Sequence, residues 1–449
     1  MRRWRWWLYW LAFVARSQVV NKIFLAAILI VLFSELSLIR RTANEPETTT
    51  TTAALTSPFF NITNLEYSNV ERRHKLIAYR CYSSKNEIHT TRRKPIRQIW
   101  RKKFNTSIRL LSAIITTHFK PNILFCPVGK VASTFLTRYI ITLVNHSSYT
   151  TPYDVPIKQS KRSMLQSLMS IKREQRPRFI KESFKFFFTR NPFSRIFSAY
   201  IDKIFTPNPF YWTKWGKKIV TSFKLSSKNY VCGSNIPFRY FVKYVLIKLH
   251  KEDTHVMPVH NHCPPCQFEW NMVGRLEDVD QDLHYLSQQL NVSSSYMNSS
   301  DYKLQALKDI IKDSSTEVLG PWMVKISKCV SRYNAGRMIW RKLQIRGIID
   351  KHFPLPVSEA EMKQISVHKF QEICLSAALR SNQSNLRLQK QEAIQEAYRT
   401  IDIHDMVQLQ TIYEKDFFYF GYKNTLENYD PKRNLTEKGI LDWRKPWIL

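Results

Sequence analysis

The sequence predicts an α/β fold in which a central, mostly parallel sheet is flanked by helices and a P-loop-like phosphate site lies at the strand ends. Two segments carry this prediction. Residues 122–144, "NILFCPVGKVASTFLTRYIITLV", contain a short apolar strand, a turn with one Gly and one Lys, and apolar residues at helical spacing. Residues 184–205, "FKFFFTRNPFSRIFSAYIDKIF", repeat this strand–loop–helix arrangement. The two loops are the candidate functional site.

An apolar run at residues 23–39, "IFLAAILIVLFSELSLI", precedes this domain. A helix of this length is just long enough to cross a bilayer, near the lower limit of about 17 residues. Five cations come before the run and no small-residue cleavage site follows it. An uncleaved signal-anchor with a cytosolic N-terminus is therefore favoured over a signal peptide or a buried helix. We predict a cytoplasmic tail at 1–22, a transmembrane signal-anchor at 23–39 and a lumenal stem at 40–65.

Charge and cysteine content fit a lumenal address. The 449 residues carry a formal net charge of +34, and +28 remains beyond the first 41 residues, which implies an anionic partner. All seven cysteines follow the anchor, so disulfides are permitted and one cysteine is left over. Nucleic acid is therefore excluded as the main partner, whereas an acidic glycan fits. Asn-X-Ser/Thr sequons, which predict a glycoprotein, begin at Asn61, Asn105, Asn145, Asn291, Asn298, Asn382 and Asn434.

The remaining chain divides by composition. Residues 66–121 are basic and irregular, as in "RRKPIRQIWRKK", and are predicted to form a solvated neck or a path for an acidic polymer. Residues 122–422 are predicted to form the folded domain, and 423–449 a C-terminal tail. Amphipathic helices are expected at 238–249, 276–290 and 406–420, and the last should end at a Gly421 cap.

The loop at Gly129 has the chemistry of a phosphate site. Backbone N–H groups at a helix N-terminus bind phosphate with the help of the helix dipole. Lys130 would add a positive charge, and Ser133 and Thr134 would donate hydroxyl hydrogen bonds. The loop is not a regular P-loop, because Leu124 stands where its first glycine is expected. An ordinary helix cap is the alternative interpretation of this loop by itself.

The second unit favours the phosphate interpretation. Arg190 closes the second strand, and Ser198 lies eight residues later in a helix that Asn191 should cap and Pro192 should begin. An Arg at a strand end and a Ser on the next helix make a second, separate phosphate subsite. Two subsites suggest a ligand that is phosphorylated at two positions, since a nucleotide with only a 5′ chain needs one.

These blocks resemble the paired cofactor motifs of Golgi carbohydrate sulfotransferases. The group in question contains the chondroitin and dermatan 4-O-sulfotransferases, the N-acetylgalactosamine 4-O-sulfotransferases and the HNK-1 sulfotransferase. Its second motif, Arg-x-Pro-Phe-x-Arg-(x)2-Ser-Ala-Tyr, is met by "RNPFSRIFSAY" at 190–200. The later segments "HVMP", "CPPC", "GRLEDVDQDLHYL" and "YEKDFFYFGY" also resemble family blocks, so the resemblance covers roughly residues 122–422.

The chain departs from the family pattern in two places. The first family motif reads Lys-Val-Gly-Cys-Thr or Lys-Val-Gly-Cys-Ser, whereas this chain has "KVAST" at 130–134. Ala132 therefore puts a methyl group where the backbone might approach phosphate closely. The stretch between the Tyr285 block and the C-terminal block is also longer than expected, which predicts an insertion at about 301–391.

The resemblance implies 3′-phosphoadenosine 5′-phosphosulfate (PAPS) as the co-substrate, with no metal. The first loop would hold the 5′-phosphosulfate, and Arg190 with Ser198 would hold the 3′-phosphate. The expected cofactor-binding residues are Lys130, Val131, Ala132, Ser133, Thr134, Arg190 and Ser198.

Two residues are candidates for the chemistry. Lys130 is the expected catalytic cation, because a positive charge at the bridging oxygen stabilises the leaving nucleotide. His255 occupies the family's His-x-x-Pro position and is the candidate general base, with a structural role as the alternative.

Competing interpretations come from other motifs. His260, His262, Cys263 and Cys266 have the residue types of a zinc site, and "CPPC" matches a redox pair, although disulfides are favoured in an oxidising lumen. "DVD" at 278–280 matches the DxD motif of metal-dependent type II glycosyltransferases. Its apolar neighbours predict an amphipathic helix instead, whereas a metal-binding DxD usually follows a strand.

We therefore expect sulfate transfer from PAPS to a glycan hydroxyl. The implied acceptor is the 4-position of N-acetylgalactosamine in chondroitin, dermatan or a related chain, and the +28 charge suits such a polyanion. The expected location is the Golgi membrane, as a single-pass type II protein with a lumenal catalytic domain. A catalytically inactive, glycan-binding homologue is the remaining alternative, because of Ala132.

Overall fold

The computed structural model describes residues 68–426, except for 90–112, 117–118, 146–147, 158, 160–164, 227–229, 294–296 and 298. All of the described residues belong to one unit of the chain, Tyr67–Leu449. The predicted cytoplasmic tail, signal-anchor and stem lie outside them, as does most of the predicted C-terminal tail. Within the described part, none of the helices has the length and apolar character needed to span a bilayer.

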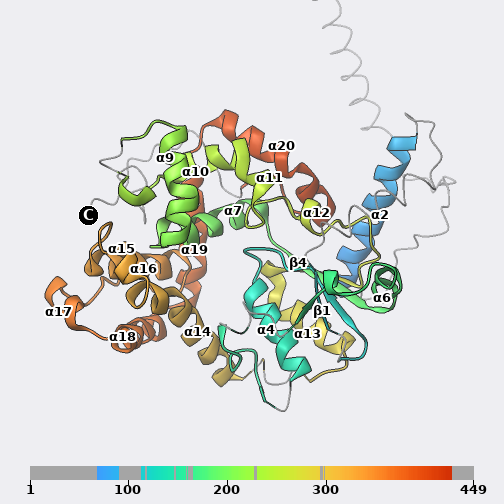
Figure 1. Ribbon diagram of the computed structural model, residues 1–449, viewed down its shortest axis with the longest axis horizontal. Helices are drawn as coiled ribbons and strands as arrows, with labels where there is room; N and C mark the ends of the chain where they lie inside the picture. Colours follow the sequence, from blue (N-terminus) through green and yellow to red (C-terminus); the bar gives the residue numbers. More distant parts are fainter. Residues whose placement is uncertain are drawn as a thin grey trace, which may run out of the picture. The chain divides into compact units, whose positions relative to one another are not determined.

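Among the described residues, one five-stranded sheet has the order β3-β1-β2-β4-β5 (Figure 1). β2, β4 and β5 are parallel neighbours, whereas β1 is antiparallel to both β2 and β3. Four of the five strands thus run in one direction, which confirms the predicted α/β class. The strands are β1 Ile114–Thr116, β2 Ile123–Phe125, β3 Gln166–Ser167, β4 Phe184–Thr189 and β5 Met272–Arg275.

A helix follows each of the three parallel strands. α4 (Ser133–Val144) follows β2, α7 (Pro192–Tyr200) follows β4, and α13 (Val279–Gln289) follows β5. The Asn191 side chain accepts hydrogen bonds from the first turn of α7, and Pro192 begins that helix, as predicted. Because the carboxyl ends of parallel strands meet at one edge of the sheet, the loops before these helices converge there.

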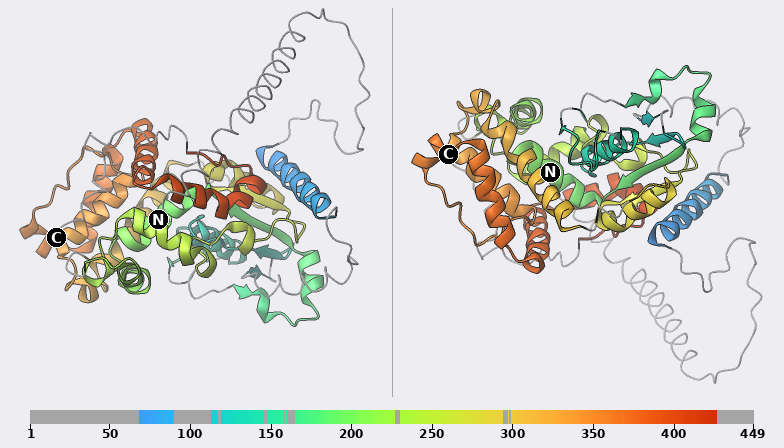
Figure 2. Two further views of the ribbon diagram at one scale, coloured as in Figure 1. Left: turned by 90° about the horizontal axis from the view of Figure 1, so that it is seen from above. Right: turned by 90° about the horizontal axis from the view of Figure 1, so that it is seen from below.

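Helix α2 (Asn69–His89) corrects the prediction of an irregular neck. Val70, Ile77 and Cys81 are buried on one face, and Arg73 on the same face is ion-paired to Asp278 and Asp282. The helix packs against β5 and α20 (Ile403–Phe420), as Figure 2 shows. The many basic residues of this segment obscured a helical spacing of apolar residues that only the packed domain makes evident.

The predicted helix at 276–290 begins later than expected. Met272–Arg275 is strand β5, Leu276–Asp278 is a single 3₁₀ turn, and α13 starts only at Val279. The predicted helix at 238–249 is helical throughout, but its second half, Val245–Leu249, is π-helical. Two more π-helical turns, Ile201–Phe205 and Trp212–Gly216, follow α7 and α8. One short helix, α6 Arg176–Glu182, precedes β4 in the sequence. The other short helices between β4 and β5 are α8 Pro209–Tyr211, α9 Lys217–Ser222, α10 Phe238–Tyr244, α11 His250–Glu252 and α12 Val259–His262.

The predicted insertion is helical. It lies on the opposite side of the domain from β1 and α2 (Figure 1) and has a hydrophobic core of its own that includes Trp340, Leu343 and Phe370. Because α14 reaches from this group to α4, where Asp309 is ion-paired to Arg138, the group contacts the sheet domain directly. Its helices are α14 Ser300–Leu319, α15 Met323–Ile326, α16 Arg332–Ile345, α17 Glu359–Gln364, α18 Val367–Arg380 and α19 Gln383–Tyr398.

The C-terminal helix α20 confirms its predicted pattern. Met406, Leu409, Tyr413 and Phe417 are buried, and Gly421 ends the helix in the left-handed conformation with φ 66°. These side chains pack with those of α7 and α10 in one cluster. α20 therefore covers the helix that begins just after Arg190.

Six of the seven cysteines form disulfides: Cys81 with Cys266, Cys126 with Cys263, and Cys232 with Cys329. Cys374 is free and buried, as the odd count predicted. The two cysteines of "CPPC" bind different partners, which argues against the redox-pair interpretation.

Candidate active site

The two predicted loops open into one cavity of about 820 Å³. Lys130, Ala132, Ser133 and Thr134 line it from the loop after β2 and the start of α4. Arg190 and Ser198 line it from the end of β4 and from α7. The structure thus brings together six of the seven residues predicted to bind the cofactor. Val131 is the exception, because its side chain is buried in the main core.

The first loop has an unusual backbone. Lys130 (φ 67°) and Ala132 (φ 52°) both adopt the left-handed conformation, which L-residues other than Gly and Asn rarely occupy. Ala132 is the N-cap of α4, so neither Ser133 nor Thr134 serves as the helix cap. The ordinary-cap interpretation of this loop is therefore wrong. The N–H groups of the first turn of α4 remain available to a ligand in the cavity.

Cations and aspartates both line this cavity, and two of the cations, Lys130 and Arg190, come from the predicted loops. Lys130 forms an ion pair with Asp202, whose other oxygen binds Lys342 Nζ at 2.8 Å. Burial, followed by the charges of Lys203, Arg346 and other neighbouring cations, lowers the pKa of Lys130 well below its ordinary value. Burial also lowers the pKa of Arg190 to about 10. The motif analysis did not identify Asp202 or Arg346, which line the cavity, or Lys342, which is connected to it only through the ion pair with Asp202.

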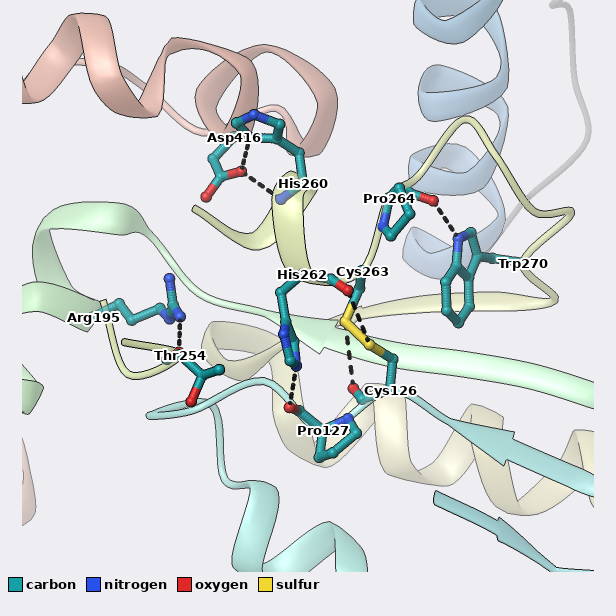
Figure 3. Close-up of a disulfide and its surroundings, with 10 residues drawn as sticks. All are labelled: Cys126, Pro127, Arg195, Thr254, His260, His262, Cys263, Pro264, Trp270 and Asp416. Atoms are coloured by element: carbon teal, nitrogen blue, oxygen red, sulfur yellow. Dashed lines mark hydrogen bonds and ion pairs between the residues drawn. A yellow bond between two sulfur atoms is a disulfide. The ribbon is translucent and has the colours of Figure 1, made fainter. Parts of the chain in front are cut away.

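Arg195 joins the first loop to the segment that contains His255. Its guanidinium, 1% exposed, donates hydrogen bonds to the carbonyl oxygens of Gly129 (2.9 Å), Thr254 (2.7 Å) and Met257 (2.6 Å). Figure 3 shows the bond to Thr254. The two segments touch at Gly129, where an added Cβ would lie 2.9 Å from the Thr254 oxygen. Only glycine fits at that contact.

A disulfide and two histidines fix the other side of the His255 segment (Figure 3). The Cys126–Cys263 disulfide joins the end of β2 to α12. His262 Nε2 lies 2.9 Å from the Pro127 oxygen, and His260 Nδ1 lies 2.8 Å from Asp416. The one candidate metal-ligand group in the described part of the chain is Cys126, His262 and Cys263. Its two sulfur atoms are bonded to each other, so these residues fit a structural role better than a zinc site.

His255 lies outside the cavity lining but next to the phosphate loop. Its Nδ1 lies 2.7 Å from Asp253 Oδ1 and 3.4 Å from the Tyr211 hydroxyl. Burial lowers the pKa of His255, and so do the charges of Lys203 and Lys130, whereas Asp253 opposes that shift. Burial would raise the pKa of Asp253, but hydrogen bonds from His255 and Lys214 outweigh burial and lower it. Nδ1 of His255 is thus held by a carboxylate, and the lowered pKa favours the neutral imidazole.

An aromatic and cationic surface adjoins His255. The Tyr211 ring packs 5.5 Å from the His255 ring and 5.0 Å from Phe210, which is 61% exposed. Lys203 Nζ lies 4.5 Å from the centre of the Tyr211 ring. Lys203 and Trp215 lie on the two π-helical turns Ile201–Phe205 and Trp212–Gly216, which place them beside Tyr211. Turns of this kind are frequent at functional sites. The motif search missed Asp253 and Tyr211, although Asp253 stands only two residues before His255.

The "DVD" segment follows a strand after all, since β5 ends at Arg275 and one 3₁₀ turn leads to Asp278. That corrects the reason given against a glycosyltransferase. Asp278, however, is ion-paired to Arg73 at 2.8 Å, while Asp280 lines the cavity. The two carboxylates therefore have different surroundings rather than a shared ligand position.

Comparison with known proteins agrees with this geometry. Residues 113–333 match the sequence profile of the sulfotransferase family. Carbohydrate sulfotransferase 14 of Danio rerio is 28% identical over 166 residues, which cover 36% of this chain and 44% of that protein. Carbohydrate sulfotransferase 11 of Mus musculus is 29% identical over 181 residues, 38% of this chain and 51% of that protein. Over the region that holds both loops, the chain is therefore similar to carbohydrate sulfotransferases.

A third relative, carbohydrate sulfotransferase 12 of Mus musculus, is 26% identical over 237 residues, 46% of this chain and 55% of that protein. The chain thus spans about half the length of the curated relatives that it matches. No solved structure matches the chain. The family match begins at 113, so strand β1 belongs to the matched region, which the predicted domain start at 122 had left out.

The left-handed conformation of Ala132 allows a direct test of backbone strain in the first loop. A left-handed L-residue costs about 1–2 kcal/mol, and glycine avoids that cost. We predict that Ala132→Gly raises the free energy of unfolding by about 1 kcal/mol, measured by urea denaturation. Ala360→Gly is the matched control, because Ala360 is exposed in helix α17, where glycine should destabilise. A loss of stability in Ala132→Gly would contradict the strain argument.

Proposed function

We propose that this protein transfers the sulfuryl group of PAPS to a hydroxyl of a glycan. The observation that supports this proposal most strongly is that two phosphate-type loops, each after a parallel strand, open into one cavity and present Lys130 and Arg190 to it. A donor with phosphate groups at both its 3′ and 5′ positions needs two such subsites. Lys130, Arg190 and Arg346 on the walls of this cavity could each donate hydrogen bonds to a ligand with several negative charges.

In this proposal the first loop holds the 5′-phosphosulfate. Lys130, the hydroxyls of Ser133 and Thr134, and the backbone of Val131 and Ala132 would surround it. Arg190 and Ser198 would hold the 3′-phosphate. Asp202 now neutralises Lys130, so phosphosulfate would compete with that carboxylate for the Lys130 ammonium group.

The reaction forms one bond and breaks another at sulfur. The acceptor oxygen bonds to the sulfur, the bond from sulfur to the bridging phosphate oxygen breaks, and the acceptor proton passes to a base. The products are the sulfated glycan and 3′,5′-adenosine bisphosphate. Lys130 would stabilise the charge that develops on the leaving nucleotide, by analogy with phosphoryl transfer.

We assign the base to His255. The Gly129 contact and the Arg195 hydrogen bonds hold its segment against the phosphate loop. With Nδ1 held by Asp253, Nε2 is the nitrogen left to accept a proton. Phe210, Tyr211 and Lys203 beside it provide an aromatic face and a cation, which suit a sugar ring with negative substituents.

The finer assignment concerns the acceptor and the location. The motif resemblance favours the 4-position of N-acetylgalactosamine in chondroitin, dermatan or a related chain. The charge of +28 beyond the first 41 residues favours a polyanion. A signal-anchor at 23–39 would place the catalytic domain in the Golgi lumen as a single-pass type II protein.

A transfer assay tests the activity. We expect a secreted form that starts near Phe60 to move labelled sulfate from PAPS to one of a panel of desulfated glycans. Lys130→Ala should lower turnover at least about 100-fold, because it removes the charge at the leaving group. Arg190→Ala should raise the donor KM about 10- to 100-fold, because it removes a charged hydrogen-bond donor.

Arg178→Ala is the control for these variants, since the Arg178 side chain is 84% exposed and does not line the cavity. A chelator should leave the activity unchanged, whereas it would abolish a DxD-dependent glycosyltransferase. Normal activity in both Lys130→Ala and Arg190→Ala would refute the site assignment. Nucleotide binding without transfer to any glycan of the panel would favour the inactive homologue.

The pH profile tests the role of His255. Because burial lowers its pKa, the neutral base should persist below the ordinary value of about 6.5, and kcat/KM should fall only at lower pH. Asp253→Asn removes the negative charge that raises this pKa, so the acid limb should move to still lower pH while kcat decreases. An unchanged acid limb in Asp253→Asn, or full activity in His255→Ala, would contradict the assignment.

A further inference from the structure

Arg346 lines the donor cavity although it comes from the helical segment, far in sequence from both phosphate loops. It follows the last residue of α16, and its backbone N–H still bonds to the Lys342 oxygen at 3.0 Å. Gly347, with φ 67°, then turns the chain away. Arg346 and Lys342 therefore lie one turn apart on the same face of α16.

The pairing of α16 with α7 locates Arg346. Lys342 is bound to Asp202, and Ser198 lies one turn before Asp202 on the continuous helix that starts with α7. Lys342 does not line the cavity, whereas Arg346, Arg190 and Ser198 all do. The positive charge of Arg346 contributes to the lowered pKa of Arg190, which places the two guanidinium groups near each other. Arg346 thus shares the cavity with Ser198 and Arg190, and its charge acts on Lys130 as well.

Arg346 also lacks a partner of its own. Within the described part of the chain its guanidinium has neither a hydrogen bond nor an ion pair, and the opposite charge that acts on it is that of Asp313, which lines the same cavity. A half-buried arginine that faces a second arginine without a bound counter-ion is costly. The arrangement suits an anion that accepts hydrogen bonds from both groups.

We propose that Arg346 is a third binding residue of the 3′-phosphate subsite, together with Arg190 and Ser198. This inference rests on the proposed function. It gives the helical segment 300–398 a role, because α16 would complete the donor site. The segment is suitably anchored: Lys342 binds Asp202, the Tyr398 hydroxyl donates to the Phe193 oxygen at 2.9 Å, and Cys329 is bonded to Cys232.

Calorimetric titration of the secreted form with two nucleotides tests the proposal. The first is 3′,5′-adenosine bisphosphate, and the second is adenosine 5′-monophosphate, which lacks the 3′-phosphate. Arg346→Ala should weaken binding of the bisphosphate about 10- to 100-fold and leave binding of the monophosphate unchanged. Arg346→Lys should fall between wild type and Arg346→Ala, because it keeps the charge but loses the planar fork.

Arg337→Ala is the matched control, since Arg337 is exposed on the same helix. This variant should bind both nucleotides like wild type. If Arg346→Ala fails to fold, Arg346→Gln, which keeps most of the side-chain volume, decides the same comparison. Equal loss of both nucleotides, or wild-type binding of the bisphosphate, overturns the inference. If only Arg190→Ala loses affinity for the bisphosphate, the inference about Arg346 is wrong while the proposed function stands. If wild type binds neither nucleotide, the proposed function itself falls.

Discussion

The buried guanidinium of Arg195 is the interaction on which the rest of the site depends. It sits on α7 and binds carbonyl oxygens of the phosphate loop and of the segment before α12. Those oxygens belong to irregular backbone, where no neighbouring strand or helix supplies N–H donors. The Arg195 side chain donates the hydrogen bonds that these buried oxygens need. The contact at Gly129 and the Cys126–Cys263 disulfide then hold the same two segments together. The candidate base therefore has a fixed position relative to the candidate donor loop.

The second constraint is electrostatic. Lys130, Arg190 and Arg346 face one cavity, and Asp202 supplies a carboxylate that binds Lys130 and Lys342. Burial of these three cations is unfavourable unless negative charges offset them, and Asp280, Asp309 and Asp313 also line the cavity. Asp202 offsets part of this cost within the protein itself. The remainder would be offset by a ligand with two phosphate groups, so the same charges that strain the free protein would favour donor binding.

Local sequence patterns predicted the parts of the fold that depend on nearby residues. The all-apolar face of β4, the Asn191 cap with Pro192, and the Gly421 end of α20 each have a local physical cause. The missed features depend on long-range contacts. α2 is stabilised by Asp278, Asp282 and Cys266, which lie about 200 residues away.

The site divides in the same way. Lys130 and Arg190 belong to short motifs that follow strands, so the sequence alone predicts their role in binding phosphate. Asp202 and Arg346 reach the cavity only because α7 continues as a π-helix and because α16 packs against it. No spacing rule within one segment marks such residues. The left-handed conformation of Ala132 was equally hidden, since alanine is an unfavourable choice for it.

The most direct test of this account is the effect of Arg195→Met on 3′,5′-adenosine bisphosphate binding, measured together with the free energy of unfolding. Arg195 does not line the cavity, so a simple contact with nucleotide cannot explain a loss. The account predicts that stability falls by about 3 kcal/mol, because buried carbonyl oxygens lose their donors, and that nucleotide affinity falls with it. The exposed Arg178→Met should change neither quantity. Wild-type stability and affinity in Arg195→Met would contradict the central role of this side chain.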